Sequence, residues 1–304
     1  RPVGCTLSLV SSADIGQEGS CCSLEDVEDA RSVAARLGMD HFVFNFKDLF
    51  RAQVMEDFVA EYRRGRTPNP CVRCNRYVKF PALLRRADDL GISHVATGHY
   101  ARVDWDGASG RWRLLRGADR RKDQSYFLYP LTQEQLSRLL LPVGDYTKDQ
   151  IRALAEELGL VNARKRDSQD ICFVPGGDYM EFLTHFGGVE PRPGDFVDAS
   201  GKVLGRHRGL ERYTAGQRRG LGVSADRPLY VTGKDLAANT VVLGDEADLY
   251  SSVVWTESFN WVSLPPQAGP LAVTAKTRYS QREAEAGLYP EDNGCVRVEF
   301  RLPQ

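Results

Sequence analysis

The pattern of apolar and polar positions in the first part of the chain alternates between strand-like and helix-like stretches. Residues 3–9 and 41–46 are short, mostly apolar runs that are typical of buried strands. Between them, Ser23 opens a helical pattern that continues through Leu37, and Asp26 completes an S-x-x-D cap at its start. A strand, a helix and a second strand in this order predict a parallel sheet with helices on both faces.

The same alternation continues to about residue 190 and then changes. Further stretches of helical or strand-like period follow at 51–63, 80–90, 94–98, 133–141 and 148–158. Beyond the PRPGD turn, short apolar runs are separated by Gly, Pro and Asp, which is typical of β-rich domains. We therefore predict an α/β domain over 1–190, a small β-rich central domain over 191–249 and a β-barrel domain over 250–304.

Three residues fall at the carboxyl ends of predicted strands, where parallel α/β sheets bind their ligands. They are Leu7, Gly98 and His99. We expect them near a ligand whatever its identity, because their position in the sheet carries the inference.

Composition narrows the class of protein. With 304 residues, 42% of them apolar and 27% charged, the chain has the composition of a globular protein of two or three domains. No apolar run approaches the roughly 18 residues that cross a bilayer. No signal peptide or lipidation motif is present either, so we expect a cytoplasmic protein with no membrane partner.

The seven cysteines are an odd number spread over a long chain, which argues against a secreted disulfide framework. Thiol chemistry or metal binding is the better hypothesis for some of them. Structural or incidental roles are expected for Cys5, Cys21, Cys22 and Cys295.

The net charge of −1 excludes a simple polycation, but basic residues are clustered. The clusters are Arg63, Arg64, Arg66, Arg73, Arg76 and Lys79; Arg111, Arg113, Arg116, Arg120, Arg121 and Lys122; Arg164, Lys165 and Arg166; and Arg206, His207, Arg208, Arg212, Arg218 and Arg219. Each cluster alone fits a solvated face that nearby acids balance. Because most of them lie beside cysteines or Gly-rich turns, the set favours phosphate binding.

The stretch GRTPNPCVRCNRYVKF at 65–80 is the most informative part of the sequence. Its prolines stiffen the approach to a C-x-x-C, and basic neighbours lower the pKa of a thiol, so Cys71 and Cys74 are candidate nucleophiles, metal ligands or both. A structural zinc site would need two further ligands at short spacing, and a thioredoxin-like dithiol would need a different strand-to-helix context. A buried, unreactive pair is the remaining alternative.

Several motifs together resemble one family, the bacterial tRNA-specific 2-thiouridylases. The stretch at 65–80 resembles the signature of this family, and further blocks follow in the family's order and spacing: ATGHYAR (96–102), KDQSYFL (122–128), KRDSQDICFVP (165–175), HRGLERYTAGQRRGLGV (207–223) and TRYSQ (277–281). The blocks extend over almost the whole chain. The resemblance implies an adenine nucleotide alpha hydrolase-like (PP-loop) domain with a parallel sheet, followed by the β-rich central domain and the barrel.

The resemblance also implies a reaction and its partners. A family member uses ATP and Mg2+ to adenylate the 2-oxygen of the wobble uridine in tRNAs of the Lys, Glu and Gln type, and a cysteine persulfide then displaces AMP. By position, Cys74 matches the nucleophile and Cys172 the cysteine that carries the persulfide. A sulfur-relay protein or cysteine desulfurase is implied as sulfur donor, together with a disulfide bond and a monomeric state.

The residues support this chemistry and also depart from it. A persulfide relay needs a thiolate of low pKa. Basic residues close to the cysteines in sequence supply positive potential: Arg73, Arg164, Lys165 and Arg166. Many family members have Asp where Cys71 stands, so Cys71, Cys74 and Cys172 could converge on a [4Fe-4S] cluster with one iron open for sulfide. This hypothesis stands beside the persulfide one.

Other site residues are carried over by their position in the family motifs. Gly98 matches the glycine of the adenine pocket and Leu7 its apolar partner, while the target base would meet Asn69, Pro70 and Cys71. The expected tRNA contacts are Lys122, Asp123, Gln124, Arg278, Tyr279 and His99. Without the motifs, Gly98 fits an ordinary turn, Leu7 a core position and His99 a surface histidine.

The family's phosphate-binding loop has no counterpart here. Its S-G-G-x-D-S loop holds the ATP phosphates through backbone amides, and neither that loop nor a G-x-x-x-x-G-K-[ST] substitute occurs. The barrel also stops before a strand that carries a tRNA-contacting glutamine. We therefore expect a chain shortened at both ends, with weak or absent adenylation. A truncated relative that only binds tRNA is the alternative, whereas other ATP-pyrophosphatase relatives would not explain TPNPC-x-x-C.

Overall fold

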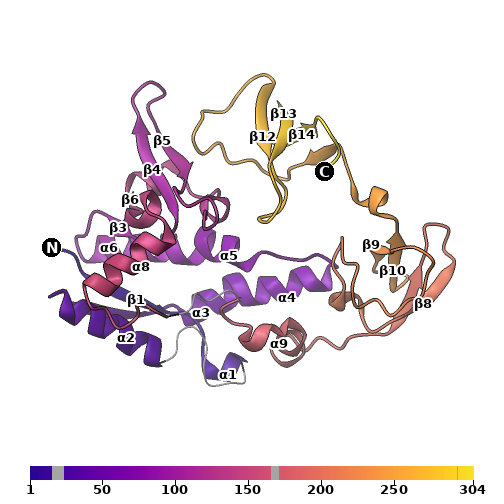
Figure 1. Cartoon of the computed structure of the whole chain (residues 1–304), viewed down its shortest axis with the longest axis horizontal. Coiled ribbons are helices and arrows are strands. Elements are labelled where there is room, and N and C mark those ends of the chain that lie inside the picture. Colours follow the sequence, from indigo (N-terminus) through magenta and orange to yellow (C-terminus); the bar gives the residue numbers. More distant parts are fainter. Residues whose placement is uncertain (16–23, 166–170, 293) are drawn as a thin grey trace. The chain divides into compact units, whose positions relative to one another are not determined.

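A computed structural model describes residues 1–15, 24–165, 171–292 and 294–304 of the chain. They form two compact units (Figure 1). The first comprises Arg1–Val59, Asn69–Gly188 and Val262–Pro265, and the second Ala60–Pro68, Val189–Trp261 and Pro266–Gln304. The sequence predicts three consecutive domains with boundaries near 190 and 249, whereas the two units are each made of several segments of the chain. The predicted boundaries therefore stay predictions.

The first unit begins with the predicted strand, helix and strand. β1 (Gly4–Ser8) and β2 (His41–Asn45) pair in parallel. α2 (Leu24–Arg36) connects them and packs against both strands. The predicted cap depends on Ser23, which lies outside the described residues. The short apolar runs therefore form a parallel pair, as their pattern predicts.

A second parallel pair joins β3 (Val95–Ala96) to β6 (Leu139–Leu140). The helix predicted over 133–141 is wrong at its end, because α7 (Gln133–Ser137) stops before Arg138. The guanidinium of Arg138 donates hydrogen bonds to the two backbone carbonyls that lie shortly before β3, at 3.0 and 3.2 Å. This contact holds the following leucines beside β3, so they extend as a strand.

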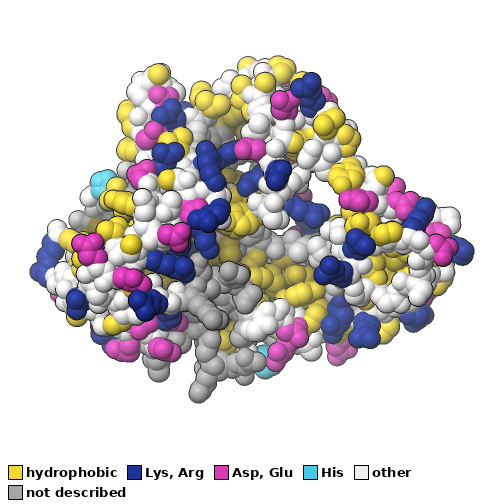
Figure 2. Space-filling view, viewed as in Figure 1, with side chains coloured by type: hydrophobic (Ala, Val, Ile, Leu, Met, Phe, Trp, Pro, Cys, Tyr) yellow, Lys and Arg dark blue, Asp and Glu magenta, His cyan; other side chains and the backbone are white. Residues whose placement is uncertain are grey.

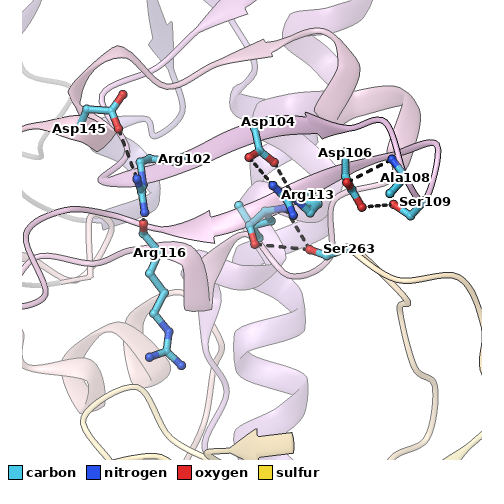
Figure 3. Close-up of polar contacts among 10 residues, drawn as sticks. Arg102, Asp104, Asp106, Ala108, Ser109, Arg113, Arg116, Asp145 and Ser263 are labelled. Carbon is cyan, nitrogen blue, oxygen red and sulfur yellow. Dashed lines mark hydrogen bonds and ion pairs between the residues drawn. The ribbon is translucent and has the colours of Figure 1, made fainter. Parts of the chain in front are cut away.

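An antiparallel hairpin that the sequence analysis did not predict follows β3. It consists of β4 (Ala101–Asp106) and β5 (Arg111–Arg116), and Asp104 on β4 pairs with Arg113 on β5 (Figure 3). Ser263 accepts a hydrogen bond from the Leu114 backbone N–H at 3.1 Å, which joins Val262–Pro265 to the first unit. The hairpin contributes to a core built from Phe80, Ala101, Leu128, Leu131, Leu136, Leu139 and Leu141.

Two long helical stretches each contain a π-helical segment. The first runs through α3 (Lys47–Phe50), the π-helix Arg51–Met55 and α4 (Glu56–Arg63). The second runs through α5 (Pro70–Arg73), the π-helix Cys74–Lys79 and α6 (Phe80–Asp89). The second stretch begins before the predicted start at 80, because Asn69 accepts a hydrogen bond from the Val72 N–H at 3.3 Å and Pro70 suits the first turn. π-helical turns are frequent at functional sites.

The other helices of the described residues are short. They are α1 (Ser12–Ile15), α8 (Lys148–Glu157) and α9 (Tyr179–His185), with 3-10 turns at Ser125–Phe127, Pro142–Asp145, Pro175–Gly177, Leu210–Arg212 and Glu246–Leu249. α8 confirms the helix predicted over 148–158, and a capping box of Thr147 and Gln150 begins it. No helix in the described ranges is long and apolar enough to cross a membrane.

The second unit contains two four-stranded sheets. The first sheet has the order β8-β7-β10-β9 and consists of β7 (Gly194–Val197), β8 (Val203–His207), β9 (Tyr230–Asp235) and β10 (Thr240–Gly244). The second is antiparallel, in the order β11-β14-β13-β12, and consists of β11 (Val253–Trp255), β12 (Leu271–Ala275), β13 (Ala284–Pro290) and β14 (Val296–Phe300). Each sheet has its own apolar core. The β-rich character predicted for the last part of the chain is confirmed.

Candidate active site

The two cysteines of the C-x-x-C motif lie on one helical stretch in different surroundings. Cys71 is exposed on α5, whereas Cys74, the first residue of the π-helix, has 8% of its surface exposed. Asn69 and Pro70, which are expected to meet the target base, form the N-terminal end of the same helix. One thiol is therefore open to a substrate, and its neighbour is protected.

Cys71 is exposed as a residue, but neighbouring protein atoms desolvate its sulfur. This desolvation raises the pKa of the thiol, and the Lys79 ammonium opposes the shift in part. Arg73, expected to supply positive potential, pairs with Asp57 at 3.0 Å. The expectation of a lowered thiol pKa is therefore wrong for Cys71.

Asn75, directly after Cys74, ties this helix to the segment that follows the KDQ motif. Its side chain is 2% exposed, and Nδ2 donates a hydrogen bond to the Phe127 carbonyl at 3.0 Å. Oδ1 is buried and has no partner among the described residues. Asn75 was not among the site residues predicted from the sequence, although a polar residue inside a helical run of apolar and basic residues is a signal of a buried contact.

The segment expected to contact tRNA uses two of its side chains internally. Asp123 accepts hydrogen bonds from the Gly117 N–H at 2.9 Å and the Ser125 hydroxyl at 2.8 Å. Gln124 bonds to Tyr100 twice, because its side chain accepts from the Tyr100 N–H at 3.0 Å and its own N–H donates to the Tyr100 carbonyl at 2.8 Å. These bonds hold the segment beside the residues that follow β3.

The residues at the strand ends occupy the positions that the pattern predicts. Leu7 is half-buried on β1, and Gly98 follows β3 with open space beside it, since a Cβ there would meet no described atom within 4 Å. His99 is half-buried and shares a hydrogen bond of 2.8 Å with the Thr97 hydroxyl. Burial and the charge of Lys79 lower the pKa of His99 to about 3, so its imidazole is neutral near pH 7.

Cys172 lies half-buried directly before a fully buried aromatic residue. Phe173 packs edge-on against three other rings, with centroid distances of 5.6, 5.2 and 4.9 Å to Phe50, Phe58 and Phe182. This aromatic cluster fixes the backbone on the C-terminal side of Cys172. Residues 166–170 on its N-terminal side, Arg166 among them, lie outside the described residues.

The described basic residues before Cys172 are compensated by acids. Lys165 Nζ lies 2.8 Å from Asp26 and 2.6 Å from Asp29, both on α2. Arg164 pairs with Glu156 at 3.0 Å. The positive potential expected to act on the Cys172 thiol is therefore largely taken up by these ion pairs.

Arginines of the second basic cluster are also paired. Arg113 forms a two-point contact with Asp104 at 2.8 and 2.7 Å (Figure 3), and Arg121 lies 3.5 Å from Asp119. On the face shown in Figure 2, Lys and Arg side chains are interspersed with acidic ones. These contacts match the balanced solvated face better than a phosphate site for this cluster.

The remaining residues expected to contact tRNA lie at or near the surface. Arg278, in the second unit, donates a hydrogen bond to the Ala215 carbonyl at 3.2 Å. The side chain of Tyr279 is 41% exposed, and Lys122 in the first unit is half-buried. Their contacts with tRNA stay predictions.

The described cysteines form neither a disulfide bond nor a metal site. All five keep their thiols, so the expected disulfide is not supported: Cys5, Cys71, Cys74, Cys172 and Cys295. Cys21 and Cys22 lie outside the described residues. Within the described ranges, no three His, Cys, Asp or Glu side chains group closely enough to hold a metal ion. The arrangement therefore does not fit a three-thiolate [4Fe-4S] site.

Three family models match the chain in succession. The tRNA methyl transferase HUP domain matches residues 3–176, the tRNA methyl transferase PRC-barrel domain 180–245, and the aminomethyltransferase beta-barrel domain 251–304. Together with the parallel strands of the first unit, they confirm the predicted fold class of a HUP-type α/β domain followed by two β domains.

Relatives named tRNA-specific 2-thiouridylase MnmA align with nearly the whole chain. The protein of Acetivibrio thermocellus is 50% identical over 287 residues, which cover 94% of this chain and 80% of the relative. The protein of Heliobacterium modesticaldum is 48% identical over 305 residues, covering 99% and 79%. That of Desulfitobacterium hafniense is 44% identical over 312 residues, covering 99% and 84%. The chain belongs to the family of tRNA-specific 2-thiouridylases.

Proposed function

We propose that the chain is a sulfurtransferase that replaces the 2-oxygen of the tRNA wobble uridine with sulfur at the expense of ATP. The observation that carries the proposal is a hydrogen-bonded framework. Asn75, beside Cys74, is bonded to Phe127, and Gln124 in the same loop is bonded to Tyr100. These bonds link the helix of the protected Cys74 thiol to the segment that is expected to meet tRNA. They also link that segment to the residues that follow β3, where a parallel sheet binds its ligand.

The proposed reaction balances with two cysteines and an external reductant. The uridine 2-oxygen attacks the α-phosphate of ATP, and pyrophosphate leaves. The terminal sulfur of a persulfide on Cys172 attacks C2 of the uridine, and AMP leaves with the oxygen. The Cys74 thiolate then attacks the Cys172 sulfur, which releases 2-thiouridine and leaves a Cys74–Cys172 disulfide for an external thiol to reduce.

The placement of the cysteines supports the persulfide route over the iron–sulfur route. Cys71 is exposed, Cys74 is buried and Cys172 is half-buried, and the three do not form a ligand set. ATP with Mg2+ would bind at the strand ends near Leu7 and Gly98, and a sulfur-relay protein or cysteine desulfurase would load the persulfide. Iron and acid-labile sulfide analysis under anaerobic conditions tests this choice, since about four irons per chain would reinstate the cluster.

A thiolation assay with unmodified tRNA, ATP and Mg2+, a cysteine desulfurase with cysteine as the persulfide donor, and an external thiol as the reductant tests the proposal. The assay compares this chain with a version that carries an upstream S-G-G-x-D-S segment, each with Cys74→Ala and Cys172→Ala. Cys295→Ala is the matched control, because Cys295 is also a half-buried thiol but lies in the second unit.

We expect 2-thiouridine at least from the version with the segment, no product from either of the first two variants, and full activity in the control. Product from the Cys74→Ala or Cys172→Ala variant would refute the assigned roles. If every version binds tRNA and none makes 2-thiouridine, the alternative of a relative that only binds tRNA replaces the enzyme.

A further inference from the structure

Residues 69–87 of the first unit carry positive charge that is compensated in part. They contain no acidic residue and five basic ones: Arg73, Arg76, Lys79, Arg85 and Arg86. Two of these form ion pairs, Arg73 with Asp57 and Arg86 with Asp89. Arg76 is exposed and has no carboxylate partner among the residues that the structure describes.

Tyr77 organises the two arginines nearest to it. The Cζ atom of Arg73 lies 4.5 Å from the centroid of the Tyr77 ring, and that of Arg76 lies 5.1 Å from it. Arg73 is fixed in addition by Asp57 at 3.0 Å and by the Gln53 carbonyl at 3.4 Å. A neutralised arginine therefore helps to hold the ring on which the exposed Arg76 is stacked.

Arg76 differs from Arg113 of the hairpin in how its guanidinium is held. Arg113 donates hydrogen bonds to both carboxylate oxygens of Asp104. Stacking restricts the guanidinium of Arg76 without using its N–H donors or cancelling its charge. The N–H donors and the charge of Arg76 are therefore available to a ligand. The ring contact has already restricted the side chain, so less conformational entropy is lost when a ligand binds.

A phosphate oxygen pair suits such a group, because a planar guanidinium binds it at two points. We propose that Arg76, held on Tyr77, binds a backbone phosphate of the tRNA. This proposal rests on the proposed function, in which tRNA is the substrate. Arg76 and Cys71 are both exposed on the same helical stretch, five residues or about 7 Å apart along its axis, so a tRNA whose uridine meets Cys71 passes within reach of Arg76.

Salt-dependent binding of unmodified tRNA to the full chain tests the proposal without any catalytic step. Each phosphate neutralised by a cation contributes about 0.7 to 0.9 to the slope of log K against log salt. Arg76→Gln should lower the slope by about this amount and weaken binding several-fold at low salt. Arg113→Gln, in which the lost arginine was already paired, should leave the slope unchanged.

Variants of Tyr77 separate the charge from its support. Tyr77→Leu keeps the charge and should keep the slope, but it should weaken binding about 2- to 10-fold because Arg76 must then be ordered on binding. Tyr77→Phe should bind as the unsubstituted chain does. Thermal melting of each variant shows whether the fold is retained.

Equal slopes and affinities for Arg76→Gln and Arg113→Gln would overturn the proposal, as would a loss of ATP binding in Arg76→Gln with tRNA binding unchanged. No tRNA binding by the unsubstituted chain would overturn this proposal and the proposed function together. The expected slope change in a chain that never thiolates tRNA would support the Arg76 contact and refute the enzyme.

Discussion

Replacing Asn75 by Ala should loosen the turn that carries Cys74. The substitution removes the 3.0 Å hydrogen bond from Nδ2 to the Phe127 carbonyl at a site where the Asn75 side chain is 2% exposed. An unsatisfied buried acceptor costs about 1–3 kcal/mol. The small cavity adds about 1 kcal/mol. Removal of the unpartnered Oδ1 offsets part of this cost, so we expect the free energy of local opening at this turn to fall by about 1–2 kcal/mol.

Alkylation of Cys74 by iodoacetamide, followed by mass spectrometry of the labelled peptide, measures this opening. Cys74 is 8% exposed, so its labelling requires the turn to open. Since 1.4 kcal/mol corresponds to a factor of ten, labelling should become about 5- to 30-fold faster in Asn75→Ala. Asn75→Asp should accelerate it at least as much, because a carboxylate cannot donate to the carbonyl and places a charge in a buried site.

Cys295 is the internal control, as a half-buried thiol of the second unit. If Cys74 labelling stays within about threefold of the unsubstituted rate, the Asn75 contact does not keep the thiol buried and the reasoning is wrong. An equal acceleration at Cys74 and Cys295 would also refute it, because that result indicates general unfolding.

Gly144→Ala should lower the thermal midpoint strongly, because its Cβ would lie 1.8 Å from a backbone carbonyl oxygen of β4. Gly107→Ala should leave the midpoint unchanged, since a Cβ there would meet no described atom within 4 Å. Equal melting curves for the two variants would contradict this expectation. Ring protons of His99 should not titrate in NMR spectra between pH 5 and 8, since its pKa is lowered to about 3. In the unfolded chain this histidine binds a proton near pH 6.5, so His99 should make the free energy of unfolding decrease as the pH falls from about 6.5 toward 3. A steeper decrease in His99→Asn would count against this. Alkylation of Cys71 should rise at a higher pH than that of an ordinary thiol, and Lys79→Met should move the profile higher still, because the ammonium lowers the pKa; a shift to lower pH would reverse the assignment.

Local periodicity predicted the elements whose environment is set by near neighbours in sequence. The apolar runs that became β1 and β2 and the capped helix α8 needed no distant partner to be recognised. The predicted end of the 133–141 helix failed, because Arg138 is held by carbonyls before β3, more than forty residues earlier. The β4–β5 hairpin was missed although ARVDWD and RWRLLR alternate with a strand period, since the arginines were assigned to a phosphate-binding cluster.

The candidate site divides in the same way. The sequence identified Cys71 and Cys74 as candidate thiols but placed the start of the helix at 80, beyond both of them. Position in the chain predicted that Gly98 and His99 follow a strand. The unequal burial of the two thiols depends on packing, and the Asn75 contact joins residues that are 52 positions apart. No local pattern encodes such a contact, so sequence alone could name the thiols but not the framework that holds them.

Charge shows most clearly why sequence neighbours mislead. Arg73, Arg113 and Lys165 all lie in basic clusters, yet each has a carboxylate partner that is distant in sequence or on a neighbouring strand. Tertiary pairing neutralises part of each of these clusters, so a phosphate is best bound by the positive charge that remains unpaired. Arg76 meets this condition because it is stacked on an aromatic ring instead of an acid. If the salt dependence of tRNA binding tracks Arg76 and ignores Arg113, residual charge after pairing is the quantity that locates the RNA surface of this chain.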